Sequence, residues 1–379
     1  MSTARIAVFA DLRAPGLGDL LQRNIGLALI RRAHPAAVLT LVVGEDLASR
    51  HGRTLTDHTL ADNLLTCPGE PGEPDDAFLR TLAGRGFALC VVDPDSAGLH
   101  AGHARAAGIP HRIGLPQGRP GDEHITHPIR LPRPLWGAPD LYEYAVGLAG
   151  ALGLPDRPRP EDVLPELPRR HGTVAPTADL PRPLVAVHPG GAPHWNRRWP
   201  HEHYARLCTL LAAEHSASFC LLGDAAERPE LGLLRDAVLA RHPRAVVRVE
   251  AGAGLERAVS ILADADLLVG NDSAPAHIAA AVRTPTVVLY GPTGTEYLWA
   301  RIYPHHTGVS LRWPCARLHH APDRLADRRC AHDCVLPYRG PAGPYPRCLA
   351  ELPVERVRSA VRDRLRTVRP HPATIRSTP

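Results

Sequence analysis

The sequence predicts an α/β protein built from two doubly wound, Rossmann-like domains that face a central cleft. Apolar strand patterns alternate with helical patterns over 5–153, and the alternation then stops in a stretch rich in Pro and Arg at 155–183. It starts again at 183 and continues to 291. A chain of 379 residues is also too long for one ordinary hydrophobic core, so two domains are expected.

The N-terminal half begins with a strand, a helix and a second strand. The apolar run 5–10 predicts a buried strand, and after a Gly-bearing turn Ile25 and Leu29 fall on one face of a helix that ends before Pro35. The run 38–43 predicts the next strand, which the usual right-handed crossover makes parallel to the first. Further strands are expected at 87–93 and 111–115, and a helix at 139–153. The segments 51–86 and 116–138, which contain Pro and Gly, predict no element.

The C-terminal half repeats this pattern. A strand at 183–190 leads into a helix expected to start with Pro200 as its first residue, and this helix carries apolar residues at i, i+3, i+4 and i+7, namely Tyr204, Leu207, Cys208 and Leu211. Strands at 217–223, 245–250, 266–270 and 285–291 alternate with helices, including those at 255–263 and 274–282. We expect an N-terminal domain at 1–160, a linker at 161–182, a C-terminal domain at 183–352, and a helix with a disordered tail at 353–379.

The composition narrows the class of protein. The net charge is +5, and the basic residues are scattered among 39 acidic ones, which does not indicate a nucleic-acid-binding face. Apolar runs are far shorter than the roughly 20 residues that a membrane span needs, and the N-terminus leads directly into a strand without a signal-peptide pattern, so we expect a cytoplasmic protein. All 44 basic residues are Arg, so any anion is expected to meet a planar guanidinium fork.

Three loops follow strands and are therefore expected at the cleft. The first is 16–21, in which Gly18 allows a close backbone approach and Asp19 begins a helix. Taken alone, an Asp at a helix start is better explained as a simple N-cap. The loop is not a GxGxxG motif, so a dinucleotide site is weakly supported.

The second loop, 188–200, contains Gly190 and Gly191, with Arg197 and Arg198 just before the predicted helix. Backbone amides at a helix start together with guanidinium groups form a cradle suited to a diphosphate. The alternative is a solvated Arg pair beside tryptophans that only pack.

The third loop, 269–281, places Asp272 and Ser273 directly after a strand, and Ala274 and His277 in the first turn of a helix whose N-terminus favours an anion. The alternative is an Asp272 that only caps the helix, and a His277 that packs at the surface.

Together these motifs make the chain resemble the ADP-heptose:lipopolysaccharide heptosyltransferases, which form glycosyltransferase family 9. The resemblance covers nearly the whole chain and is carried by a combination of motifs: GLGD at 16–19, HPGG and RRWP within 188–200, LLGDAAE at 221–227, DSAPAH at 272–277, TPTVVLYGPT at 284–293 and CLAELPVERV at 348–357.

The resemblance implies a GT-B fold, with an acceptor on the N-terminal domain and a nucleotide sugar on the C-terminal domain. It implies an inverting, metal-independent transfer of a sugar, heptose from ADP-heptose, to an acceptor hydroxyl. The nucleotide sugar is then a co-substrate, and no cofactor is expected. The family's general base corresponds to Asp19, and its acid near the ribose corresponds to Glu227. The donor site would comprise these residues: Gly18, Gly190, Gly191, Arg197, Glu227, Asp272, Ser273, Ala274 and His277.

Two positions depart from the family. Arg197 stands where the family has a Lys before the Trp-Pro pair, and a guanidinium supplies the same charge without being able to lose its proton. Ala274 replaces the commoner Gly, and its methyl group bears on how closely the donor approaches, or on which sugar fits.

Other interpretations remain open at this point. The alternatives in function are transfer from another nucleotide sugar to a secondary metabolite or cell-surface glycan, an epimerase or hydrolase on the same fold, and a non-catalytic nucleotide-binding module. Four cysteines near the C-terminus, Cys315, Cys330, Cys334 and Cys348, form an irregular cluster that is either a structural metal site or a set of free thiols, and His201 with His203 is a weaker metal pair. The sequence does not predict the oligomeric state.

Overall fold

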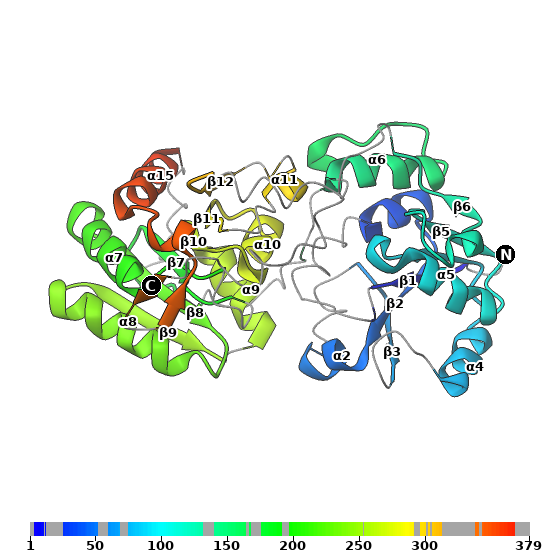
Figure 1. Cartoon of the computed structure of the whole chain (residues 1–379), viewed down its shortest axis with the longest axis horizontal. Helices are drawn as coiled ribbons and strands as arrows, with labels where there is room; N and C mark the ends of the chain where they lie inside the picture. The colour runs from blue at the N-terminus through cyan, green and yellow to red at the C-terminus, as the bar shows by residue number, and fades with distance from the viewer. Residues whose placement is uncertain are drawn as a thin grey trace, which may run out of the picture. The chain divides into compact units, whose positions relative to one another are not determined.

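A computed structural model of the chain describes residues 4–10, 12, 26–51, 60–68, 75–131, 140–163, 167, 176–191, 197–252, 254–291, 296–300, 302–303, 305–312, 338–340 and 343–367. The chain divides into two compact units, Met1–Pro168 and Arg169–Pro379 (Figure 1). The division falls within the expected linker at 161–182.

The N-terminal unit is built around a six-stranded parallel sheet with the order β3-β2-β1-β4-β5-β6. Its strands are β1 (Arg5–Phe9), β2 (Val38–Gly44), β3 (Asn63–Cys67), β4 (Leu89–Val92), β5 (His111–Gly114) and β6 (His127–Pro128). The helices are 26–33, α2 (Glu45–His51), α4 (Asp76–Gly84), α5 (Ala97–Ala106) and α6 (Leu141–Ala151), with short 3-10 turns η1 (Pro94–Ser96), η2 (Asp122–His124) and η3 (Pro160–Val163).

The C-terminal unit has a second six-stranded parallel sheet, with the order β12-β11-β10-β7-β8-β9. Its strands are β7 (Leu184–His188), β8 (Ser218–Gly223), β9 (Val246–Ala251), β10 (Leu267–Asn271), β11 (Thr286–Leu289) and β12 (His306–Val309). The helices are α7 (His201–His215), α8 (Arg228–Arg241), α9 (Gly254–Asp264), α10 (Ala274–Ala281), α11 (Glu296–Trp299), α14 (Arg347–Ala350) and α15 (Val354–Thr367), and β13 (Tyr338–Gly340) pairs with β14 (Gly343–Tyr345) in a small hairpin.

Both sheets have the same doubly wound topology. In each, the chain builds outward from a central strand in one direction and then returns to build in the other, so that the order reverses between β1 and β4 and again between β7 and β10. Open parallel sheets bind ligands beyond the carboxyl ends of the strands at such reversal points. The predicted α/β fold class is confirmed.

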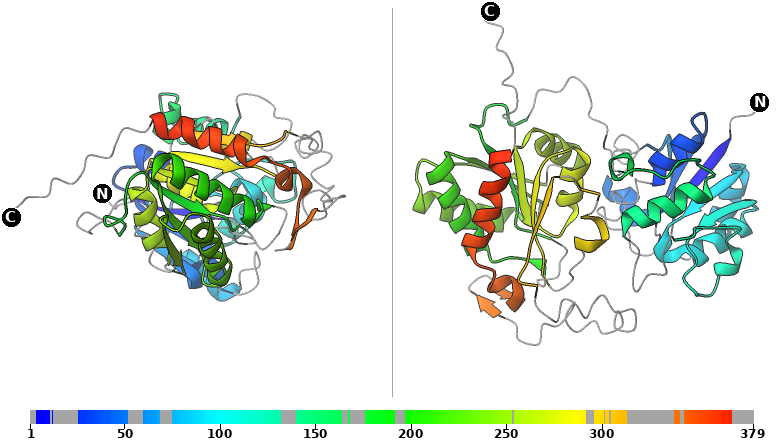
Figure 2. Two further views of the ribbon diagram at one scale, coloured as in Figure 1. Left: turned by 90° about the vertical axis from the view of Figure 1, so that its left-hand side faces the viewer. Right: turned by 90° about the horizontal axis from the view of Figure 1, so that it is seen from above.

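The strand β7 lies at the centre of the sheet in the C-terminal unit, between β10 and β8. All five residues of β7 are buried, as expected for a parallel strand covered on both faces. The last helix, α15, lies beside α7 (Figure 2) and packs Val354, Val357 and Val361 into the same core as α7 and β7. Its outer face carries arginines, so α15 closes the core on one side and presents charge to solvent on the other.

Some elements lie where the sequence predicted none. The strand β3 and the helix α4 fall within 51–86, and the start of α4 is capped by Asp75, whose side chain accepts a hydrogen bond from Phe78 N. The helix α5 has weak amphipathicity because it is rich in small residues, and a Cβ on Gly98 would lie 2.8 Å from Pro120 O. That close approach to a neighbouring loop is not visible as periodicity. Pro200 is the N-cap of α7, and His201 is the first helical residue.

None of the described helices is both long enough and apolar enough to cross a bilayer.

Adjacent leucines on α8 give a matched test of the core. Leu234 is 2% exposed and Leu233 is 71% exposed. We expect Leu234→Ala to lower the free energy of unfolding by about 2–5 kcal/mol, because it opens a cavity in the core. Leu233→Ala should change it by no more than about 0.5 kcal/mol. Urea unfolding followed by circular dichroism measures both, and equal effects would contradict the assignment of the core face of α8.

Candidate functional site

Three loops of the C-terminal unit begin at neighbouring strand ends. The strands β10, β7 and β8 lie side by side in that order, and they end at Asn271, His188 and Gly223. Two of the loops predicted from the sequence, those that follow β7 and β10, therefore start at the reversal point of the sheet. The loop after β8, which carries Glu227, starts beside them.

Asn271 holds two of these loops together. Its Nδ2 donates to Pro189 O (2.7 Å) and to Gly190 O (2.9 Å). Its Oδ1 accepts from Trp199 N (3.1 Å) and from the Tyr204 hydroxyl (2.9 Å). The residue is 1% exposed, so all of these bonds are shielded from water. The glycine loop and the start of α7 are thus fixed to the end of β10.

Glu227 lies beside the glycine loop. Its Oε2 accepts from Asp224 N and its own N–H donates to the Asp224 carboxylate, both at 2.9 Å. A Cβ on Gly190 would lie 2.6 Å from Glu227 Cδ, and one on Gly223 would lie 2.8 Å from its Oε2. Both glycines therefore make room for this carboxylate. Burial raises the pKa of Glu227 above its ordinary value.

Arg198 connects Glu227 to its surroundings. One guanidinium nitrogen lies 3.4 Å from Glu227 Oε1 and 3.3 Å from Gly191 O, and the other lies 3.3 Å from Glu230 Oε2. The alternative of a solvated Arg pair is therefore wrong for Arg198, which is partly buried and paired with two carboxylates.

Arg197 has a different environment from its neighbour. Its guanidinium makes no hydrogen bond or ion pair with any residue that the structure describes. Its charge is nonetheless one of the causes that lower the pKa of His277, which locates it near the start of α10. Of the two adjacent arginines, Arg197 is the one left to meet a ligand.

His188, the last residue of β7, bridges the other two loops. Its Nδ1 is 3.0 Å from the Ser273 hydroxyl, and its Nε2 is 4.0 Å from Glu227 Oε2. Burial, together with the charge of Arg198, lowers the pKa of His188 to about 4. The imidazole is therefore neutral near pH 7 and adds no charge to the site.

The N-terminus of α10 faces the same strand ends. Ser273 is its N-cap, in an extended conformation, and no described side chain caps the helix. The Ser273 hydroxyl donates instead toward Asn271 O (3.2 Å) or His188. The suggestion that Asp272 caps the helix is thus wrong; Asp272 is buried, and its N–H donates to Leu289 O. An uncapped helix start carries amides and a positive dipole end, which together suit an anion.

His277 is buried within α10, and the alternative of a surface residue is wrong. Its Nδ1 is 3.0 Å from the Tyr303 hydroxyl, and its ring packs edge-on against Trp299 with centroids 5.0 Å apart. Burial, and to a lesser extent the charges of His306 and Arg197, lower its pKa to about 4. Ala274 is the first residue of the same helix.

Several residues predicted from the sequence fall outside the part of the chain that the structure describes. Gly18, Asp19, Cys315, Cys330 and Cys334 lie outside the described residues. Cys348 is half-buried, and Cys67, Cys90, Cys208 and Cys220 are buried free thiols. Within the described part of the chain, no group of three or more His, Cys, Asp or Glu is arranged to hold a metal ion. His201 pairs with Glu230 (3.8 Å), and His203 packs on Trp199.

The sequence reasoning missed Asn271 and His188 as site residues. Both stood inside the loops considered in the sequence analysis, 188–200 and 269–281, each as the last residue of a strand, which is the position where a side chain reaches the ligand edge of a parallel sheet. That position was the available signal. The role of Tyr303 had no signal, because it depends on a contact with His277 across 26 residues.

Comparison with known proteins gives a family match over most of the chain. The model of glycosyltransferase family 9 (heptosyltransferase) matches residues 92–327. The lipooligosaccharide heptosyltransferase 2 of Haemophilus influenzae is 36% identical over 116 residues, covering 31% of this chain and 33% of that protein. The lipopolysaccharide heptosyltransferase 2 of Escherichia coli is 32% identical over 205 residues, covering 50% of this chain and 56% of that protein. The matched region thus spans about a third to about half of these relatives.

Solved structures agree in fold. The E. coli ADP-heptose lps heptosyltransferase II superposes with a TM-score of 0.67 at 21% identity, covering 96% of this chain and 99% of that one. The E. coli heptosyltransferase WaaC with ADP gives a TM-score of 0.62 at 16% identity, with coverage of 96% and 99%. At these identities the similarity establishes the architecture of two Rossmann-like domains.

Asn271→Ala tests the junction of the loops. Truncation leaves the buried groups of Pro189, Gly190, Trp199 and Tyr204 without their partner, so we expect a loss of at least about 2 kcal/mol in the free energy of unfolding. Asn63→Ala is the matched control, because Asn63 is exposed on the strand β3 at the edge of its sheet, and it should stay within about 0.5 kcal/mol of wild type. Chemical denaturation measures the difference, and a mild effect of Asn271→Ala would show that the loops are held by other contacts.

Proposed function

The chain belongs to glycosyltransferase family 9, the heptosyltransferases, and on that premise we propose that it transfers a sugar from a nucleotide diphosphate to an acceptor hydroxyl. The observation that carries the proposal is the meeting of three loops at neighbouring strand ends. One brings Arg197, which pairs with no described residue, and another begins a helix whose N-cap Ser273 makes no side-chain capping hydrogen bond. A group with two negative charges fits this arrangement.

We propose ADP-heptose as the donor and a lipopolysaccharide-type glycan as the acceptor. The support is by likeness: E. coli WaaC is a heptosyltransferase solved with ADP, and the E. coli relative is a lipopolysaccharide heptosyltransferase. The nucleotide sugar is a co-substrate in this proposal.

The diphosphate would lie between Arg197 and the start of α10. The amides that follow Ser273 point out of the helix end, and Gly190 and Gly191 present backbone without side chains. Arg197 then neutralises the charge that develops on the leaving diphosphate. Because helix amides and a guanidinium supply the positive charge, the proposed transfer needs no metal ion.

The ribose would be held by Glu227. Its carboxylate is kept in place by Asp224 N and by Arg198, and His188 closes its other side at 4.0 Å. A fixed carboxylate of this kind accepts hydrogen bonds from two adjacent hydroxyl groups. The arrangement orients the nucleotide so that its diphosphate reaches the start of α10.

The chemical step proposed for Asp19 is general-base catalysis. The acceptor oxygen forms a bond to the anomeric carbon, and the bond from that carbon to the β-phosphate oxygen breaks. The electron pair leaves with ADP, and the acceptor proton passes to the Asp19 carboxylate. A single displacement of this type inverts the anomeric configuration.

Nucleotide binding tests the donor site. We expect ADP, without metal, to stabilise the protein by about 2.7 kcal/mol at 100 times its dissociation constant, and UDP, GDP, CDP and dTDP to stabilise it less. Arg197→Ala should weaken ADP binding about tenfold to a hundredfold, because a charge-assisted contact is lost. Arg235→Ala, an exposed residue of α8 paired with Asp236, should have no effect. Thermal shift and calorimetry measure both, and the absence of a response to every nucleotide would refute the donor site.

Asp19→Ala tests the chemical step. We expect turnover to fall by a factor of about 10² to 10⁴ while ADP affinity stays unchanged, because a general base acts on the acceptor and not on the nucleotide. Asp76→Ala, at an exposed position in the first turn of α4, serves as the control. Release of ADP in the presence of donor and acceptor is the assay. Activity near wild type in Asp19→Ala would mean that this residue only caps a helix.

A further inference from the structure

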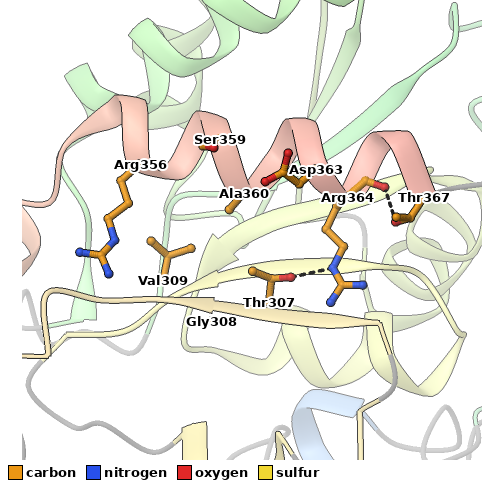
Figure 3. Close-up of a pocket in the computed structure, with 9 residues that line it drawn as sticks. All are labelled: Thr307, Gly308, Val309, Arg356, Ser359, Ala360, Asp363, Arg364 and Thr367. Atoms are coloured by element: carbon orange, nitrogen blue, oxygen red, sulfur yellow. Dashed lines mark hydrogen bonds between the residues drawn. The ribbon is translucent and has the colours of Figure 1, made fainter.

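A groove of about 490 Å³ lies between α15 and the edge strand β12, away from the proposed nucleotide loops (Figure 3). In the order of the sheet, β11 separates β12 from β10, so the groove is on the flank of the C-terminal unit. It is lined by Thr307, Gly308, Val309, Arg356, Ser359, Ala360, Asp363, Arg364 and Thr367. Its volume is in the range of small-molecule sites.

Arg364 lies at one end of the groove. Its guanidinium donates to the Thr307 hydroxyl and to His306 O, each at 2.6 Å. Both acceptors are neutral, and no described carboxylate pairs with it. Burial lowers the pKa of Arg364, which shows that the cost of desolvating this charge is not offset by a nearby anion. An anion entering the groove would offset it.

Arg356 lies toward the other end, beside Val309 (Figure 3). It is exposed, and its side chain makes no hydrogen bond or ion pair with the described residues. Arg356 and Arg364 are eight residues apart on one helix, or about 12 Å at 1.5 Å per residue. Side chains of this length are able to reach the same ligand from its two ends.

The groove lining carries a net positive charge although it includes Asp363. That carboxylate lies 3.9 Å from Arg366 and 4.0 Å from Arg362, so two arginines outside the groove lining offset its charge. Between the two ends the walls are formed by small residues, Ser359 and Ala360, which leave the space open.

We propose that this groove is a second ligand site, which binds a small phosphate-bearing compound between Arg364 and Arg356. A guanidinium matches the geometry of phosphate oxygens with two parallel N–H donors. The Thr307 and Ser359 hydroxyls supply further donors along the groove. The site is separate from the donor loops and does not require the proposed transfer reaction.

The test is calorimetric titration of the full chain with inorganic pyrophosphate. All variants carry Arg197→Ala, so that the donor loops contribute little to the signal. Arg356→Gln should weaken binding about tenfold or more, and Arg364→Gln should do so as well. Because the Arg356 side chain makes no hydrogen bond or ion pair with the described residues, its replacement tests the site without disturbing the fold. Arg235→Gln is the control, since Arg235 lies on α8 outside the groove lining and pairs with Asp236, and it should bind like the parent protein.

Three results would overturn the proposal. One is an absence of pyrophosphate binding in the Arg197→Ala parent. Another is equal weakening by Arg235→Gln, which would show a diffuse charge effect. The third comes from a parallel titration with phosphatidylglycerol vesicles: if Arg356→Gln and Arg364→Gln weaken vesicle binding but leave pyrophosphate binding intact, the groove faces lipid headgroups and not a free compound.

Discussion

The side-chain amide of Asn271 is the contact on which the arrangement of the C-terminal loops depends. Where β7 and β10 end, the strands no longer pair, and the carbonyls of Pro189 and Gly190 are left without partners from the sheet. Asn271 donates to both and accepts from the start of α7. A buried amide with both its oxygen and its nitrogen engaged resists movement, because each broken bond leaves a desolvated group. The start of the glycine loop is therefore fixed by a side chain of the protein itself.

The charged groups of these loops fall into a paired set and an arginine outside it, and burial determines which group belongs to which. Glu227 and Arg198 neutralise one another, and His188, which lies next to both, stays uncharged because desolvation lowers its pKa to about 4. Without that shift, a second positive group would compete with Arg198 for the Glu227 carboxylate. The result is a compensated region around the proposed ribose site and, in the next loop residues, an Arg197 that no described carboxylate compensates. A nucleotide diphosphate has the complementary pattern, neutral at the ribose and negative at the phosphates.

The sequence predicted the parts of the fold that depend on local pattern. Four of the five strand patterns from 183 to 291 are apolar runs that end at a Gly, and the strand ends then locate the loops. It did not predict β3, which has five residues and a weak alternation, or α5, whose small residues serve a close backbone approach. In the site, RRWP gave two adjacent arginines, but their different roles depend on Glu227 and Glu230, some 30 residues further along the chain. Contacts across that distance have no periodic signature.

The helix α15 has two roles: its apolar residues close the core, and its arginines line the groove. Its apolar residues Val354, Val357 and Val361 complete the core against α7, which fixes the rotation of the helix about its axis. Once that rotation is set, the direction of every other side chain on the helix is fixed as well, and Arg356 and Arg364 line the side toward β12. A polypeptide without Lys presents such charges only as guanidinium groups, which stay protonated even where burial lowers their pKa. The positive groove is thus a consequence of how the core is closed, and it persists across the physiological pH range.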